Sequence, residues 1–269
     1  MVTTTLIMVC LLWTNLTILY NMLDKEIVRL KVTGDFACFT RPDLKVERMS
    51  YPCMTPSAAR GILEAILWKK EFQWYIRRII VLEPIEFCSI KRNEITKLQN
   101  PKSNPIDITD IDNRVQRNSI VLKDVGYIIE ASVFVDDTLI DDTKNSNNPI
   151  TVMKYRKMFK RRVDKGQCWH QPCLGTREFA ADFSEPTEED KPKERIDYPI
   201  GSMLYDMLYD DEGKVTPLFF YNVAIKNNIL ECPEDKANKM LSSSHLIPPK
   251  NSDYNRVIYE HYQKEEAEL

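Results

Sequence analysis

The densest group of chemically useful side chains lies between Lys154 and Lys165, in the run KYRKMFKRRVDK. Seven of its twelve residues are basic and one is acidic. Helical spacing would put four of the cations on one side: Lys154, Lys157, Arg161 and Lys165. Such a row can hold nucleic-acid phosphates without reading bases. A solvated helix face is the alternative interpretation, and composition alone favours neither.

Other basic residues occur in predicted loops beside side chains that can stack or form hydrogen bonds. They form three groups: Arg41 and Arg48 before Tyr51, Lys91 and Arg92 before Asn93, and Arg114 with Gln116 and Arg117. Loop arginines near aromatic rings suit single-stranded RNA, whose bases are open to stacking and hydrogen bonding. Taken singly, each is best explained as a surface charge. Their number favours RNA.

Histidine is suited to proton transfer near neutral pH, and His170 lies in a compact polar segment, residues 166–172 (GQCWHQP). A histidine there is either catalytic or satisfies a turn, and the residues alone favour the turn. His245 and His261 lie in a weakly patterned C-terminal stretch, so we interpret both as structural.

Other kinds of site are not indicated. The sequence has no P-loop, glycine-rich dinucleotide motif, hydrolase triad or carboxylate cluster with metal spacing. Its seven cysteines include no C-x-x-C pair, and Cys168 and Cys173 around His170 lack the second ligand pair of a structural zinc site. We expect no metal and no cofactor, and the cysteine pattern favours a reducing cytoplasm.

The charge is distributed unevenly along the 269 residues. Residues 24–181 carry 27 Lys and Arg against 21 Asp and Glu, whereas residues 182–269 carry 10 against 19. The net charge of −3 therefore hides a basic body, which is where a polyanion would bind, and an acidic C-terminal part. With 43% hydrophobic residues, the chain is expected to bury a sizeable core.

The N-terminal residues 6–23 are apolar and uncharged, which invites a membrane interpretation. No Lys or Arg precedes them, so the basic region of a signal peptide is missing, and Thr14, Asn15 and Thr17 interrupt the middle. We interpret residues 1–23 as an extension from a start codon assigned too early, with translation from Met22. A membrane anchor is the alternative.

The patterns along the rest of the chain alternate between strand and helix. Thr55 and Pro56 supply an N-cap and a first-turn proline, and Gly166 supplies a C-cap. Helices are predicted at residues 57–68 and 151–165, and strands at residues 26–33, 72–82, 85–90, 119–135, 174–183, 203–209 and 218–225. Residues 91–119 are polar and predict a long surface excursion. This order predicts an α+β fold with a ferredoxin-like sheet.

Several stretches together resemble the Cas five family of CRISPR-associated RAMP proteins, in its type I-C (Dvulg) branch. They are residues 34–42 (GDFACFTRP), 45–48 (KVER), 50–51 (SY), 56–68 (PSAARGILEAILW), 92–94 (RNE), 113–117 (NRVQR), 166–179 (GQCWHQPCLGTREF) and 217–220 (PLFF). The similarity runs in order from about residue 26 to about residue 233.

The resemblance implies an RRM-like RAMP domain (residues 24–183), a small C-terminal antiparallel β domain (184–234) and a mobile tail (235–269). It also implies a metal-independent endoribonuclease that cuts precursor guide RNA in the repeat and keeps the 5′ handle. Its partners would be the backbone and large subunits of a type I-C surveillance complex and, indirectly, target DNA. A catalytically silent guide-RNA-binding subunit is the alternative. Neither reading involves a membrane.

The resemblance also implies the site residues. Lys154 matches the family's catalytic lysine, whereas Tyr155 stands where His is expected and Leu67 stands where Tyr or His is expected. Tyr155 could still move a proton if Lys154 lowers its pKa, and His170 is the second candidate. The residues expected to bind RNA are Arg41, Arg48, Tyr51, Arg60, Lys69, Arg92, Arg114, Arg117, Lys157, Arg161, Gln167 and Arg177.

Overall fold

The computed structural model describes residues 27–44, 46–97, 104–135, 151–209 and 215–232. The predictions for residues 1–23 and 235–269, including Met22, His245 and His261, lie outside these ranges. No helix in the described ranges is long and apolar enough to cross a membrane.

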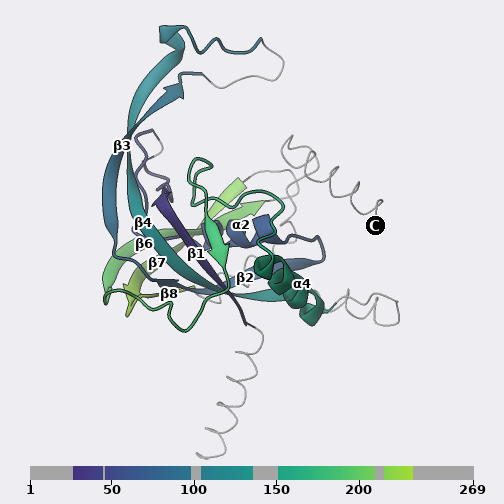
Figure 1. Cartoon of the computed structure of the whole chain (residues 1–269). Helices are drawn as coiled ribbons and strands as arrows, with labels where there is room; N and C mark the ends of the chain where they lie inside the picture. Colours follow the sequence, from purple (N-terminus) through teal and green to yellow (C-terminus); the bar gives the residue numbers. More distant parts are fainter. Residues whose placement is uncertain (1–26, 45, 98–103, 136–150, 210–214, 233–269) are drawn as a thin grey trace, which may run out of the picture.

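One antiparallel sheet organises the chain, with two helices packed on one of its faces (Figure 1). Its first part follows the order β-α-β-β-α-β. The elements are β1 (Ile27–Ala37), α2 (Pro56–Ile66), β2 (Phe72–Val81), β4 (Arg114–Val135), α4 (Val152–Asp164) and β5 (Asp182–Ser184). In the sheet these strands lie in the order β5-β1-β4-β2. The predicted combination of helices with an antiparallel sheet is confirmed, and the fold is mostly β.

The C-terminal strands extend the same sheet. They are β6 (Tyr198–Tyr209), β7 (Val215–Lys226) and β8 (Ile229–Glu231). β8 pairs with β2, with Ile79 opposite Leu230, and the order continues as β8-β7-β6. The strands predicted at residues 203–209 and 218–225 are therefore confirmed. The structure adds that β8 joins them by hydrogen bonds to β2, in the first part of the sheet.

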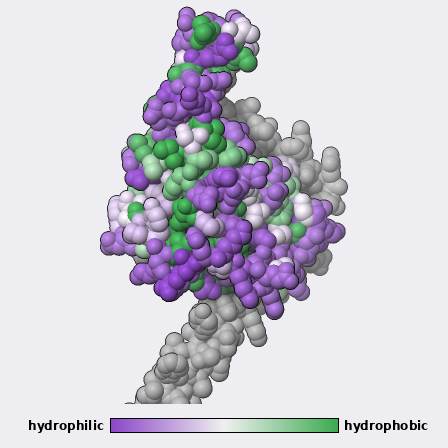
Figure 2. Space-filling model, turned by 60° about the vertical axis from the view of Figure 1, so that its left-hand side comes forward, coloured by the Kyte–Doolittle hydropathy of each residue, from purple (hydrophilic) through white to green (hydrophobic). Residues whose placement is uncertain are grey.

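A long hairpin projects from this body (Figure 1). It consists of β3 (Glu86–Ile95) and the first half of β4, and a short 3-10 helix, η1 (Ile111–Asn113), precedes β4. The predicted surface excursion over residues 91–119 projects as expected, but residues 91–95 and 114–118 of it are strand rather than loop. Burial alternates along this hairpin, with one face half-buried or buried and the other exposed, but the half-buried face carries the charged residues Arg92, Glu94 and Arg117. The usual alternation of apolar and polar residues is therefore missing. In Figure 2 hydrophilic residues cover most of its neck.

Caps explain where the two helices begin. The hydroxyl of Thr55 accepts from the Ala58 N–H at 3.2 Å, and the hydroxyl of Thr151 accepts from the Lys154 N–H at the same distance. Gly166 follows α4 with a φ of +62°. Both predicted helices are confirmed. The core beneath them includes Leu30, Val32, Ile62, Ile66, Trp74, Ile129 and Phe159.

Candidate functional site

Three arginines meet around Glu94 in the outer half of the β3–β4 hairpin. Arg92 and Arg117 lie directly opposite each other in the β3–β4 register. Glu94 pairs with Arg92 at 2.8 Å, with Arg117 at 3.3 Å and with Arg48 at 3.7 Å. Glu178 pairs with Arg92 at 2.8 Å. We call Arg48, Arg92 and Arg117 the arginine cluster; its three cations exceed the two carboxylates by one charge.

The members of the arginine cluster differ in accessibility. The Arg92 side chain is 12% exposed, which fits a structural position, and the Arg48 and Arg117 side chains are 34% and 31% exposed. Arg114 lies three register pairs farther out, about 10 Å at the usual strand rise, and donates to the carbonyl of Thr109 at 3.3 Å. The cluster therefore brings together three predicted RNA-binding residues and leaves Arg114 outside.

Tyr51 does not present its ring to solvent. It is 4% exposed and belongs to the core, and this burial raises its pKa. The guanidinium of Arg41 lies 5.9 Å from the Tyr51 ring centroid and pairs with Asp43 at 3.0 Å. The prediction that Tyr51 stacks on RNA is therefore not compatible with its position, because a stacking ring needs an open face. Arg41 keeps a partly exposed guanidinium.

Arg60 is held by carboxylates inside the protein. It donates to Asp206 and Glu64, and the Asp206 side chain is 2% exposed. This arrangement gives Arg60 a structural role and removes it from the residues that we propose for RNA. Lys69 lies half-buried in the loop after α2, and Gln167 and Arg177 are exposed in the segment after α4.

His170 lines a cavity of about 360 Å³ between α2 and the segment that contains Cys173 and Gly175. Gly175 has a φ of +88°, and a Cβ there would lie 2.1 Å from the carbonyl oxygen of Cys38, so only glycine allows this close approach. Burial and the nearby charge of Arg177 lower the pKa of His170. The imidazole is therefore neutral at pH 7 and able to accept a proton.

Lys154 and Tyr155 lie in the first turn of α4. The Lys154 Nζ is 5.5 Å from the centroid of the Tyr155 ring. Tyr155 is 2% exposed and packs on Phe72 with a centroid separation of 4.6 Å. Burial, together with the charge of Glu71, raises the pKa of Tyr155 to about 12. The condition set for Tyr155 as a proton-transfer group, a pKa lowered by Lys154, is not met, because desolvation of the phenolate dominates.

The structure separates the candidate proton-transfer groups. Asp164 lies ten residues after Lys154 in α4, about 15 Å at the helical rise, and His170 follows that far end. Near His170, Trp169 donates its N–H to the carbonyl of Ala65, and Arg162 donates to Ile66. His170 therefore lies by the C-terminal halves of both helices, away from the first turn of α4.

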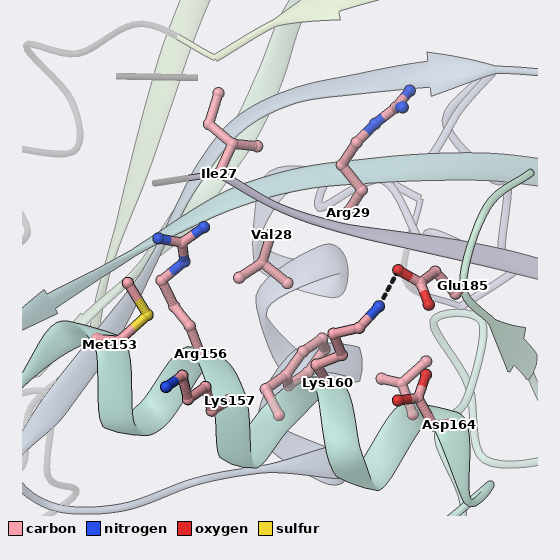
Figure 3. Close-up of a pocket in the computed structure, with 11 residues that line it drawn as sticks. Ile27, Val28, Arg29, Met153, Arg156, Lys157, Lys160, Asp164 and Glu185 are labelled. Atoms are coloured by element: carbon pink, nitrogen blue, oxygen red, sulfur yellow. Dashed lines mark hydrogen bonds and ion pairs between the residues drawn. The ribbon is translucent and has the colours of Figure 1, made fainter. Parts of the chain in front are cut away.

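The outer face of α4 carries the exposed cations Lys157 and Arg161. Lys157 also lines a groove between α4 and β1 (Figure 3). Within the described ranges, no cluster of His, Cys, Asp and Glu could hold a metal ion.

A sequence model of a protein family, described as CRISPR-associated protein (Cas_Cas5), matches residues 27–227. The chain belongs to the Cas5 family. It is 41% identical over 223 residues to the CRISPR pre-crRNA endoribonuclease Cas5d of Mannheimia succiniciproducens, covering 77% of this chain and 94% of the relative. It is 39% identical over 230 residues to the protein of the same name from Thermus thermophilus, covering 79% and 94%. The predicted resemblance is confirmed.

Two solved structures share the fold with this Cas5-family chain. A CRISPR-associated protein is 20% identical with a TM-score of 0.54, over 77% of this chain and 91% of its own. The protein SMU1763c from Streptococcus mutans, titled functionally uncharacterized, is 18% identical with a TM-score of 0.54, over 78% and 93%.

Leu67 is the clearest departure from the Cas5 pattern that the resemblance implied. Its side chain is 0% exposed in the core, and its carbonyl accepts from the Trp74 Nε1 at 3.0 Å. A tyrosine or histidine there would have to enter well-packed space, so a substitution at Leu67 would change packing as well as chemistry.

Sequence reasoning missed Arg29 and Arg156, which line the groove beside α4 in this Cas5-family chain. Arg29 lies in an alternating strand, where a charged residue indicates only the solvent side. Arg156 lies in the basic run itself, so its helical phase could have set it apart from the row of Lys154 and Arg161. The carboxylates that hold the arginine cluster gave no signal, because Glu178 is distant from Arg92 in sequence.

Proposed function

We propose that this chain cleaves CRISPR precursor guide RNA within the repeat and stays bound to the 5′ handle as a subunit of a type I-C surveillance complex. The observation that carries the proposal is the 41% identity, over 94% of the relative's length, to a protein named as a CRISPR pre-crRNA endoribonuclease. The guide RNA would be the direct ligand, the backbone and large subunits the protein partners, and target DNA an indirect one.

We also infer that residues 24–183 form an RRM-like RAMP domain and residues 184–234 a small β domain. The β-α-β-β-α-β order and the strand order β5-β1-β4-β2 support the first domain. The β6–β7 hairpin supports the second.

The proposed cleavage needs no metal. The ribose 2′-hydroxyl attacks the adjacent phosphorus, the O2′–P bond forms and the P–O5′ bond breaks. A base takes the 2′ proton, an acid protonates the leaving 5′ oxygen, and a cation stabilises the phosphorane charge. The products would be a 2′,3′-cyclic phosphate and a 5′-hydroxyl.

The chain offers two arrangements for these roles. Lys154 would supply the positive charge and Tyr155, protonated because its pKa is raised to about 12, would supply the acid. Neutral His170, with Arg177 nearby, would supply a base and a charge at the other location. Because α4 separates these two pairs of residues, we propose that one pair holds the scissile phosphate and the other holds a different part of the same RNA.

Cleavage of a labelled repeat RNA in excess EDTA tests this function. We expect a product that ends in a 2′,3′-cyclic phosphate, and we expect a 2′-deoxy substitution at the cut nucleotide to stop cleavage with affinity nearly unchanged. A cut that disappears in EDTA would contradict the mechanism.

The second candidate function is a binding subunit that holds RNA cut by another enzyme. The buried Leu67 and the buried Tyr155 favour it, because neither offers an exposed proton-transfer group. Tight binding of the repeat RNA without any cleavage, under single-turnover conditions, would select this candidate.

A further inference from the structure

A groove of about 260 Å³ lies between α4 and the start of β1 (Figure 3). Its apolar lining includes Val28 of β1 and Phe159 and Val163 of α4, which are core residues or pack against the core. Met153 lies at its edge and is 53% exposed. The groove therefore offers an apolar floor, partly exposed at Val28 and Met153 and backed by the buried Phe159 and Val163, beside a helix that is otherwise strongly basic.

At one end of the groove the charges neutralise one another. Lys160 forms an ion pair with Glu185, and Asp164 lines the same region (Figure 3). Arg29 pairs with Glu130 at 3.0 Å, although its side chain stays 52% exposed. This end has no net positive charge to offer a ligand.

At the other end lie two cations for which the described part of the chain provides no counter-charge. No carboxylate among the described residues pairs with Arg156 or Lys157, and the Nε of Arg156 is buried without a hydrogen-bond partner there. Figure 3 shows Arg156 extending from α4 toward the first residues of β1. An unsatisfied buried donor is costly, and a guanidinium matches a phosphate group through two parallel hydrogen bonds.

We infer that this groove binds one nucleotide of the guide RNA, with its phosphate at Arg156 and Lys157 and its sugar and base on the apolar floor. The inference rests on the proposed function and assigns part of its RNA path. Lys157 belongs both to the groove and to the outer face of α4, so one RNA strand can continue from one to the other.

The size and charge of the groove favour a nucleotide over an acidic peptide. Its volume lies slightly below the roughly 300 Å³ of small ligand sites, so it suits a single compact unit. No carboxylate in the described ranges neutralises its cationic end, whereas Asp164 and Glu185 would repel further acidic side chains at the other end. One phosphate followed by an uncharged base matches this distribution.

The test uses the full chain and a set of repeat RNAs that carry the 2′-deoxy block, each with one phosphate replaced by a neutral methylphosphonate. The unaltered protein should bind an RNA more weakly when a phosphate that the protein contacts is replaced by a methylphosphonate. Arg156→Gln should weaken binding of the natural phosphate backbone by about tenfold, as loss of a charge-assisted hydrogen bond does. Arg156→Gln should also make the affinity insensitive to methylphosphonate replacement at one position, that of the phosphate which Arg156 contacts.

Two further variants complete the experiment. Arg156→Lys, which keeps the charge without the bidentate geometry, should retain sensitivity at that position. Arg195→Gln is the matched control, because Arg195 is exposed, pairs with Asp197 and does not line the groove. It should leave the whole sensitivity profile unchanged. Thermal melting of each variant shows whether it is folded.

The outcomes separate this inference from the proposed function. Suppose that the unaltered protein binds and cuts RNA, and that Arg156→Gln is still weakened by methylphosphonates at all the positions that weaken the unaltered protein. The groove is then not an RNA site, and the proposed function stands. If that variant instead loses only assembly with other subunits, the groove binds protein and the inference is overturned. If the unaltered protein neither binds nor cuts, both fail.

Discussion

Arg60 of α2 donates two hydrogen bonds to Asp206 of β6, at 2.6 and 2.7 Å. Glu64, one turn along α2, accepts a third from the same guanidinium at 2.6 Å. Burial raises the pKa of Glu64 even though Arg60 opposes this effect. Since α2 lies early in the chain and β6 late, this buried group of charges ties the first part of the fold to its C-terminal strands.

Removing either member of this pair should destabilise the protein. Arg60→Ala leaves Asp206 buried without a counter-charge and should lower the free energy of unfolding by about 3–5 kcal/mol. Asp206→Ala leaves Arg60 paired with Glu64 at 2.6 Å, so its cost should be smaller. Urea unfolding followed by circular dichroism measures it. The exposed pair of Arg195 and Asp197 is the control, for which Arg195→Ala should cost less than about 1 kcal/mol. If all three variants lose the same small amount of unfolding free energy, Arg60 has no structural role.

Gly175→Ala should disturb the segment that carries His170. The new Cβ would meet the carbonyl of Cys38 at 2.1 Å, and a φ of +88° strains any residue with a side chain. We expect a loss of stability of at least about 1–3 kcal/mol and weaker RNA binding. Gly166→Ala is the matched control: its φ of +62° is also positive, but no atom lies within 4 Å of the added Cβ. A Gly175 variant as stable as the Gly166 variant would contradict the close approach.

Lys154→Ala should raise the cleavage barrier by about 2–4 kcal/mol, as removal of one electrostatic stabiliser does, with a much smaller change in affinity. Single-turnover cleavage and direct binding measure the two quantities. Lys157→Ala removes the same charge one turn along α4 and should mainly reduce affinity. If the two variants show the same losses, Lys154 contributes only to binding.

The pH dependence of cleavage should distinguish the two arrangements. The pKa of His170 is lowered below its ordinary value of 6.5, so a base at His170 would be active above that pKa and lost as the pH falls through it. His170→Ala would then remove the acidic limb of the profile. Because the pKa of Tyr155 is raised to about 12, the phenol stays protonated, and no loss of rate from Tyr155 ionisation is expected up to about pH 10. An acidic limb that persists in His170→Ala would assign the base elsewhere.

Charge reversal on the outer face of α4 should weaken RNA binding with little regard to sequence. For the double variant Lys157→Glu and Arg161→Glu, we expect the slope of log affinity against log salt to fall by roughly 0.7 for each lost phosphate contact. Lys226→Glu, on the exposed side of β7, is the control. An unchanged slope in the double variant would mean that this face is only solvated.

Local signals in the sequence predicted the parts of the fold that local forces determine. Thr55 and Thr151 mark helix starts because their hydroxyls satisfy free N–H groups at those points. The hairpin was missed because its half-buried face carries the charged side chains of Arg92, Glu94 and Arg117, so burial alternates along β3 whereas hydrophobicity does not. The pairing of β8 with β2 joins residues far apart in sequence, and nothing local encodes it.

The sequence indicated which kinds of residue could form the candidate site, but not how they are arranged. A basic residue in sequence does not show whether its partner is a phosphate or a carboxylate, which is why Arg60 was assigned to RNA although Asp206 holds it. Tyr51 was assigned to stacking because its neighbours are basic, while its burial follows from tertiary packing. Arg48, Arg92 and Arg117 were named as candidates in three separate groups, and only the fold shows that Glu94 draws them together.

β4 is a single strand of 22 residues that pairs with β1 and β2 in the body and with β3 in the hairpin. Insertions and deletions between the body and the arginine cluster, in residues 86–91 and 118–123, are therefore constrained in number. Because side chains alternate along a strand, a change of two residues in each of these segments keeps Arg92 and Arg117 on their present side, whereas a change of one turns them to the opposite side. Natural variation in the length of these two segments among relatives should thus occur in even steps wherever these arginines are retained.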